Sequence, residues 1–145
     1  MRKIEIPLEK LLPIEASLRW RNVWRINCTY IDKNHFPPIP VIQYEDSFVL
    51  GDGHSRSAVL ALNGEKTVPA NVLENNADIA NCSTGAFDKK IRFQIDTIDQ
   101  FLRQYERVWR PGCLARGVKC FTDLLEGRKK VPLWMDIMYT FTDIH

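Results

Sequence analysis

The 145-residue sequence has only four cysteines, and no two of them show the Cys-x-x-Cys spacing of a zinc ribbon or a thioredoxin-type redox site. No apolar run is long enough to span a bilayer, and no apolar signal segment opens the chain. We therefore expect a cytoplasmic protein with reduced thiols and no membrane partner, in which the cysteines serve as small core residues.

A strong excess of charge of one sign is also missing. The formal net charge is +2, which is too small to predict a nucleic-acid or anionic-membrane partner by itself. The sequence has no internal repeats and no low-complexity tracts. What it does have is an apolar fraction of 45%, enough for a real core, and a length that suits one domain with a small helical appendage.

Hydrophobic patterns predict an α+β fold with a small mixed sheet. Alternation at the start of the chain predicts a strand that ends in a helical turn at Pro13, and a looser pattern predicts a helix from Ser17 onward. Pro69 favours an edge or a start position for the last strand. The other elements expected in the first half are a hairpin of Val41–Tyr44 with Phe48–Leu50, a helix His54–Leu62 with an Asn63-Gly64 C-cap, and a strand Thr67–Leu73.

The second half is expected to be helical. The polar segment Asn75–Gly85 is interpreted as a linker, which divides the chain into a core at 1–75 and a C-terminal helical extension at 76–145. The apolar stripes of this extension are expected to form core or a subunit contact, which leaves a homodimer open. Three helices are expected: 91–109 stopped by Pro111-Gly112, 114–125 ending at Gly127, and 133–141.

The most informative segment joins the hairpin to the helix and reads Gly51-Asp52-Gly53-His54-Ser55-Arg56. Free N–H groups at a helix start, together with the helix dipole, form a site for an anion such as phosphate. Gly51 and Gly53 let the backbone pass close to a ligand, and Ser55 lies in the same first turn. An arginine in that turn is poorly placed for the dipole, so Arg56 is expected to have an anionic partner.

Each of these residues also has a purely structural interpretation. In that interpretation Asp52 or Ser55 caps the helix, and His54 is a helix-start residue packed on the sheet. Glu15, which follows the first strand, is a solvated loop carboxylate in that interpretation. The segment lacks both the P-loop string and the Gly-x-Gly-x-x-Gly fingerprint, so it matches no common nucleotide motif.

The order of these motifs resembles the ParB N-terminal/sulfiredoxin superfamily, often labelled the ParB-like nuclease domain. The resemblance covers residues 3–74 and is carried by Ile4-Glu5-Ile6-Pro7-Leu8, Pro37-Pro38-Ile39-Pro40-Val41, the Asp52-Gly53-His54-Ser55-Arg56 turn, and Val68-Pro69-Ala70-Asn71-Val72. It implies a ParB/sulfiredoxin-like sheet with a nucleotide-binding turn. Among the branches, the turn is most similar to the Asp-Gly-His-His-Arg pattern of the free-serine kinases, with Ser55 in place of the second histidine.

The resemblance implies roles for individual residues. Glu15 matches the glutamate that acts as base on the substrate hydroxyl, and Asp52 and His54 would be the other catalytic groups. Gly51, Gly53, His54, Ser55 and Arg56 would bind the nucleotide, with Asp52 on a metal ion. The implied cofactor is ATP, ADP or CTP with Mg²⁺, and the reaction is phosphoryl transfer to a small hydroxyl compound or nucleotide hydrolysis.

Two other classes of function stay open. A DNA-binding or nuclease module is suggested by the family label, by the basic Arg128-Lys129-Lys130 segment and by the arginines that interleave with Trp20 and Trp24. Those arginines are equally compatible with one amphipathic helix, which is the interpretation that the small net charge favours. A scaffold that merely keeps the fold would bind neither nucleotide nor DNA.

Overall fold

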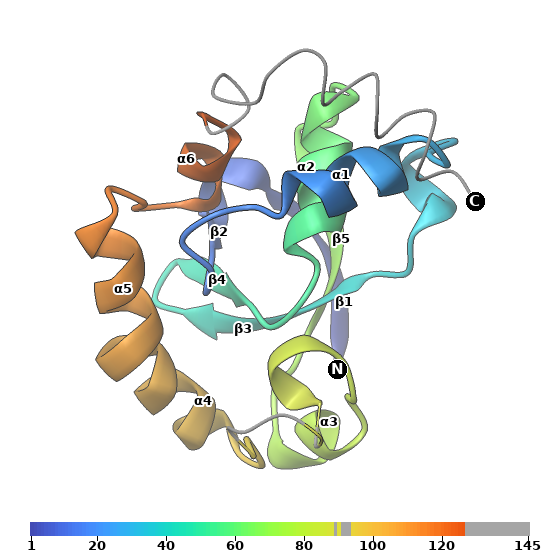
Figure 1. The fold of residues 1–145 in the computed structure, drawn as a ribbon. Coiled ribbons are helices and arrows are strands. Elements are labelled where there is room, and N and C mark those ends of the chain that lie inside the picture. Colours follow the sequence, from blue (N-terminus) through green and yellow to red (C-terminus); the bar gives the residue numbers. More distant parts are fainter. Residues whose placement is uncertain (89, 91–93, 127–145) are drawn as a thin grey trace.

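The computed structural model describes residues 1–88, 90 and 94–126, and it confirms an α+β fold built on a five-stranded mixed sheet (Figure 1). The strands are β1 (Arg2–Pro7), β2 (Leu11–Leu12), β3 (Ile39–Tyr44), β4 (Ser47–Leu50) and β5 (Thr67–Val72). The α-helices are α1 (Trp20–Asn27), α2 (His54–Leu62), α3 (Asn76–Ala80), α4 (Ile98–Gln104), α5 (Arg110–Ala115) and α6 (Phe121–Leu125).

The strand order is β1-β5-β3-β4-β2. The hairpin partners β3 and β4 are antiparallel, and so are β1 and β5. The short strand β2 runs parallel to β4 at the edge of the sheet, with Leu11 opposite Phe48 and Leu12 opposite Val49. Because the carboxyl ends of parallel strands meet at the same edge, the segments that follow β2 and β4 are brought together.

Helices cover both faces of the sheet. Successive side chains of a strand point to opposite faces, so Val41 and Ile42 enter different hydrophobic clusters. On the Val41 side the cluster includes side chains of α1, α2 and α6, and α1 and α2 lie side by side (Figure 1). On the Ile42 side the cluster includes side chains of α3 and α4. Side chains from beyond residue 76 thus take part in both clusters.

Several sequence predictions are confirmed. The hairpin forms as expected, and α2 spans His54–Leu62 and is followed by Gly64 in the left-handed conformation, at φ 85°. The expected turn after the first strand is a 3₁₀ helix, Leu8–Lys10, but Leu11 and Leu12 form β2 instead of extending that turn. The helix expected from Ser17 begins at Trp20.

The edge position expected for the strand that contains Pro69 is wrong, because β5 lies between β1 and β3. Proline is tolerated there because the pairing of β5 with β3 starts only at Ala70, one residue further on. The linker at Asn75–Gly85 is also wrong. It contains α3, which is capped by the Asn75 side chain, and it leads into a 3₁₀ turn that buries Phe87.

The helix stop at Pro111-Gly112 is wrong as well. A π-helical segment, Tyr105–Trp109, connects α4 directly to α5, and its wider turn accepts Pro111, which has no N–H to donate. The next helix does not run over 114–125, since Gly117 at φ 76° breaks it between α5 and α6. The expected helix at 133–141, the Gly127 stop and the basic residues Arg128–Lys130 lie outside the described residues.

Candidate functional site

The predicted site residues gather at one edge of the sheet, beyond the carboxyl ends of β2 and β4. Glu15 follows β2 and Asp52 follows β4. The two carboxylates are close enough that the charge of Asp52 raises the pKa of Glu15. Both side chains line the same two adjoining cavities, together with His54. The parallel pairing of β2 with β4 therefore places residues 37 positions apart in one site.

The turn between β4 and α2 is fixed by backbone conformation and by Asp52. Gly53 is the N-cap of α2 at φ 92°, a left-handed conformation that glycine adopts without strain. Oδ1 of Asp52 accepts the Gly53 N–H at 2.8 Å, and Oδ2 accepts from Nη2 of Arg56 at 3.2 Å. The expected anionic partner of Arg56 is thus present within the turn itself. Since both side chains keep some exposure, 21% for Arg56 and 32% for Asp52, a ligand can compete for either.

His54 is buried, with 6% of its surface exposed, and its Nε2 accepts the backbone N–H of Ile14 at 3.0 Å. An imidazole nitrogen that accepts is unprotonated, so the neutral ring carries its proton on Nδ1. Burial lowers the pKa of His54 to about 4, although the charge of Asp52 acts in the opposite direction. The ring is therefore neutral at pH 7, and it holds the segment that presents Glu15.

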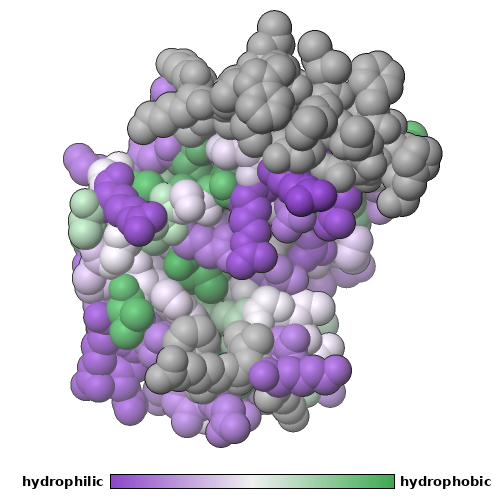
Figure 2. Space-filling model, in the orientation of Figure 1, coloured by the Kyte–Doolittle hydropathy of each residue, from purple (hydrophilic) through white to green (hydrophobic). Residues whose placement is uncertain are grey.

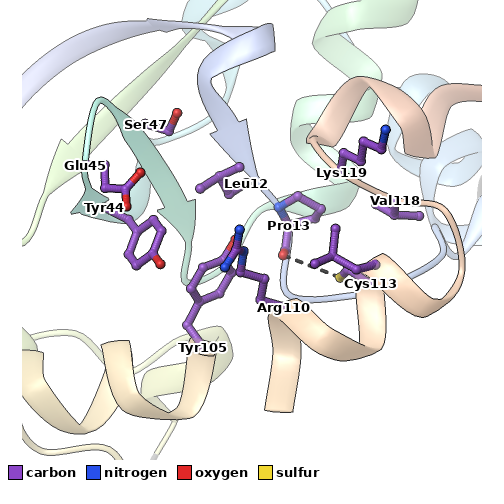
Figure 3. A pocket seen from close by; sticks show the side chains of 11 residues that line it. Leu12, Pro13, Tyr44, Glu45, Ser47, Tyr105, Arg110, Cys113, Val118 and Lys119 are labelled. Atoms are coloured by element: carbon purple, nitrogen blue, oxygen red, sulfur yellow. Dashed lines mark hydrogen bonds between the residues drawn. The ribbon is translucent and has the colours of Figure 1, made fainter. Parts of the chain in front are cut away.

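A second contact holds the same segment from the other side. The Cys113 thiol on α5 donates to the carbonyl oxygen of Pro13 at 3.6 Å (Figure 3). This contact lies at the wall of a cavity of about 290 Å³, here named the hairpin cavity, which Tyr44 and Tyr105 help to line. The rings of these tyrosines meet edge to face, with centroids 5.1 Å apart. The loop before Glu15 is thus attached both to α2 and to α5.

Glu15 has the surroundings of a proton acceptor. Partial burial of the carboxyl group raises its pKa, the charge of Arg19 acts to lower the pKa, and the charge of Asp52 raises it further. A carboxylate with a raised pKa is a stronger base than a fully solvated one. Glu15 is not hidden, since it remains on the exposed part of the cavity wall. It is therefore both basic and reachable.

The first of the two cavities that share Glu15 and Asp52 has a volume of about 460 Å³ and carries three arginines. We call it the arginine cavity. Arg19, the N-cap residue of α1, and Arg25 within α1 line it, and Arg56 lines it from the first turn of α2. Gly53 and Ser55 also line it, so the N-terminus of a nine-residue helix opens into it. Cationic side chains and free N–H groups together favour an anion.

The second cavity, of about 560 Å³, adjoins the arginine cavity and shares Glu15, Arg19, Asp52 and His54 with it, and we call it the carboxylate cavity. Its wall contains Gly51, Asp88 and Trp109, beside Glu15 and Asp52. The turn at 85–87 closes this wall, since Ala86 donates its N–H to the carbonyl oxygen of Gly51 at 2.8 Å. Trp109 is the last residue of the π-helical segment, and π-helical turns often occur at functional sites.

The comparisons with known proteins add no family. No model of a known protein family matches the chain, and no curated protein matches it. The resemblance to the ParB/sulfiredoxin superfamily therefore stays a prediction.

Within the described residues, no helix is long and apolar enough to cross a membrane. On the face shown in Figure 2, hydrophilic side chains cover most of the visible described surface, with small hydrophobic areas between them.

The side chains of the site limit how a divalent metal ion could be held. Among residues 1–88, 90 and 94–126, no cluster of three or more His, Cys, Asp or Glu side chains is arranged to hold a metal ion. Mg²⁺ bound with a nucleotide needs no such cluster, because it is usually held by one or two carboxylates together with the phosphates. The pair of Glu15 and Asp52 fits that requirement, and it does not fit a metal held by protein alone.

Sequence reasoning missed Arg19 and Arg25 as site residues, and it missed the whole turn at 85–87. The spacing of Arg19, Asn22 and Arg25 puts all three on one face of a helix, which was the available signal. The sequence could not tell that this face turns toward Arg56. The cluster was interpreted as solvated arginines on an amphipathic helix, and α1 is such a helix with Val23 buried on its inner side.

Proposed function

We propose that the chain binds a nucleotide by its phosphates in the arginine cavity and transfers a phosphoryl group to a hydroxyl in the carboxylate cavity. One observation carries the proposal. Glu15 and Asp52 line two adjoining cavities, one with three arginines and a helix N-terminus and a second one large enough for a small molecule. Phosphoryl transfer needs charge neutralisation and a positioned nucleophile next to each other, which these cavities can supply.

The phosphates are held by charge and by backbone N–H groups. Arg56 has a forked guanidinium that pairs with two phosphate oxygens at once, and Arg19 and Arg25 neutralise further charge. The entering phosphate competes with Asp52 for Arg56, so Asp52 is released from its ion pair when the ligand binds. The charge of Arg56 is thus neutralised by Asp52 before the ligand binds and by the phosphate afterwards.

The reaction is balanced by one proton transfer. The acceptor hydroxyl attacks the terminal phosphorus, a new P–O bond forms, and the bond to the leaving phosphate oxygen breaks. The proton of the hydroxyl passes to the Glu15 carboxylate, whose raised pKa suits it as general base. With water in place of the hydroxyl compound, the same step is hydrolysis. Neutral His54 takes no proton and positions Glu15 through Ile14.

Mg²⁺, when bound with the nucleotide, would be held by Asp52 and would supply neutralisation of the charge between the transferred and leaving phosphates. The residues of the chain do the rest. They orient the phosphates, place the hydroxyl and accept its proton.

Phosphorus NMR tests the proposal directly. The protein is incubated with ATP, ADP or CTP and Mg²⁺, alone and with a panel of small hydroxyl compounds, and the terminal phosphate signal is followed. Loss of that signal with formation of a phosphate ester or inorganic phosphate, abolished by Glu15→Gln, is expected. If no nucleotide is consumed, or if Glu15→Gln is as active as the original chain, the proposed reaction is wrong.

A further inference from the structure

A third cavity adjoins the arginine cavity and has different chemistry. It has a volume of about 240 Å³ and shares Arg56 and Thr84 with the arginine cavity. We call it the proline cavity, because its wall includes Pro37, Pro38 and Pro40. Leu73 adds a further apolar side chain. A ligand whose phosphates contact Arg56 therefore has an apolar compartment directly beside it.

One polar group in this wall is unexplained by the fold. Asn71 on β5 lines the proline cavity, and its Oδ1 is buried without a hydrogen-bond partner in the part of the chain that the structure describes. A buried carbonyl without a donor is costly, and native proteins leave few of them. The terminal torsion of asparagine is broad and roughly two-fold, so rotation about it can exchange the amide oxygen and nitrogen and present the oxygen to the cavity. A ligand donor there would satisfy it.

We infer that the proline cavity binds the base of the nucleotide and that Asn71 selects a base with an exocyclic amino group. This inference rests on the proposed nucleotide binding and deepens it. The apolar faces of the proline rings and the Leu73 side chain accept a planar heterocycle. The amide oxygen accepts from the amino group, and the amide N–H₂ donates to the neighbouring ring nitrogen. Adenine and cytosine both offer this donor–acceptor pair.

The matched ligands for this inference differ by one group. Inosine triphosphate replaces the amino group of ATP by a carbonyl, and UTP does the same for CTP, without a change of ring size. We expect the original chain to bind at least one amino member of these pairs roughly tenfold or more tightly than its carbonyl partner, the scale on which an amide–base pair discriminates. Calorimetry with Mg²⁺ present measures all four affinities.

Asn71→Ala should reduce the preference within the selected pair to about twofold, because the discriminating amide is gone. Asn34→Ala is the control and should keep the full preference, since Asn34 carries the same amide but is exposed on the turn Lys33–His35 and lines none of the three cavities. Inorganic tripolyphosphate, which has no base, should bind the original chain and both variants equally.

The outcomes separate the two proposals. Tripolyphosphate bound together with equal affinities within each nucleotide pair would overturn the base site and leave the phosphate site standing. A preference that survives Asn71→Ala would overturn the role of Asn71. If Asn71→Ala fails to fold, the affinities of the original chain within the two nucleotide pairs still decide whether the protein recognises the amino group. If neither tripolyphosphate nor any nucleotide binds, the proposed function itself fails.

Discussion

Glu15 and Asp52 are neighbouring carboxylates with different surroundings. Asp52 is occupied, because it accepts the Gly53 N–H and pairs with Arg56. Glu15 is kept in place by its backbone, and its carboxyl has a pKa that burial raises. Two carboxylates whose environments differ in this way are suited to different tasks. We assign the base to Glu15, and the control of Arg56 and of Mg²⁺ to Asp52.

Substitution of each carboxylate by its amide separates these tasks. Glu15→Gln should lower turnover by roughly a hundredfold or more while nucleotide affinity stays nearly unchanged, the usual scale for loss of a general base. Asp52→Asn frees Arg56, so it should strengthen pyrophosphate binding without Mg²⁺ and weaken the gain that Mg²⁺ gives. Steady-state kinetics and calorimetry provide both readings. Effects on thermal stability alone would make the two carboxylates structural.

His54 should make stability depend on pH. Its pKa is lowered to about 4 in the folded chain from 6.5 in the unfolded chain, so the unfolded state binds more protons between these values. Stability is therefore full above pH 6.5 and falls as the pH drops toward 4. Between pH 7.5 and 5, the loss should be on the order of 2 kcal/mol, at about 1.4 kcal/mol per pKa unit.

The control for this prediction is His54→Gln, which keeps an acceptor for the Ile14 N–H but does not titrate. Chemical denaturation at both pH values measures the free energy of unfolding. Glu15, with its raised pKa, acts in the opposite direction, since its contribution to stability is lost as the pH rises through that pKa, and it does so equally in both proteins. An equal loss in the original chain and in His54→Gln would show that His54 is not the titrating group.

At the scale of elements, the entry into α2 depends on Gly53. A Cβ at this position would collide with the Ile39 side chain, in addition to the strain of φ 92°. Gly64, at the other end of α2, has φ 85° but open space around its Cα. Gly64→Ala should therefore cost about 1–2 kcal/mol from backbone strain alone. Gly53→Ala should cost clearly more and should also weaken tripolyphosphate binding.

Thermal denaturation and calorimetry on this glycine pair measure both effects. Gly64→Ala serves as the control, because it changes the same helix by the same group, away from the cavity. If the two variants are equally stable and bind tripolyphosphate alike, the conformation of the turn does not matter for the site.

The outer face of α1 is the second element that the site needs. Arg19 and Arg25 line the arginine cavity, whereas Arg21 does not. Arg19→Ala and Arg25→Ala should each weaken tripolyphosphate binding by about threefold to tenfold, a modest effect because these side chains are exposed. Arg21→Ala should change it by less than about twofold, although it removes the same charge. Titrations at two salt concentrations check this, and three equal losses would point to net charge alone.

For the whole molecule, local sequence signals predicted local structure. The hairpin follows from two apolar runs around a short polar turn, and α2 follows from its apolar positions and the Asn63-Gly64 cap, all of which act within a few residues. The anion site at Gly51–Arg56 could be predicted for the same reason, since its glycines, its helix start and its arginine are neighbours in the sequence. The ion pair within the turn joins Arg56 to Asp52, which lies four residues before it in the sequence and just before the helix start.

Long-range placement was not available from the sequence. The two-residue strand β2 is too short to show a pattern, yet its pairing with β4 is what places Glu15 beside Asp52. The segment 75–85 is polar because its side chains cap α3 and line the edge of the site, and polarity alone indicated a linker. The π-helical turn before Pro111 depends on packing, whereas a proline rule considers only neighbours.

Calorimetric titration of Mg²⁺–ATP and Mg²⁺–CTP into the original chain, Arg56→Ala and Arg21→Ala tests whether the arginine cavity binds a nucleotide. We expect at least one nucleotide to bind to the original chain and to Arg21→Ala. Arg56→Ala should lose about 1.5–3 kcal/mol of binding free energy, the scale of hydrogen bonds to a charged group. Absence of binding heat with both nucleotides and with pyrophosphate, or equal affinity in all three proteins, would contradict nucleotide binding in this cavity.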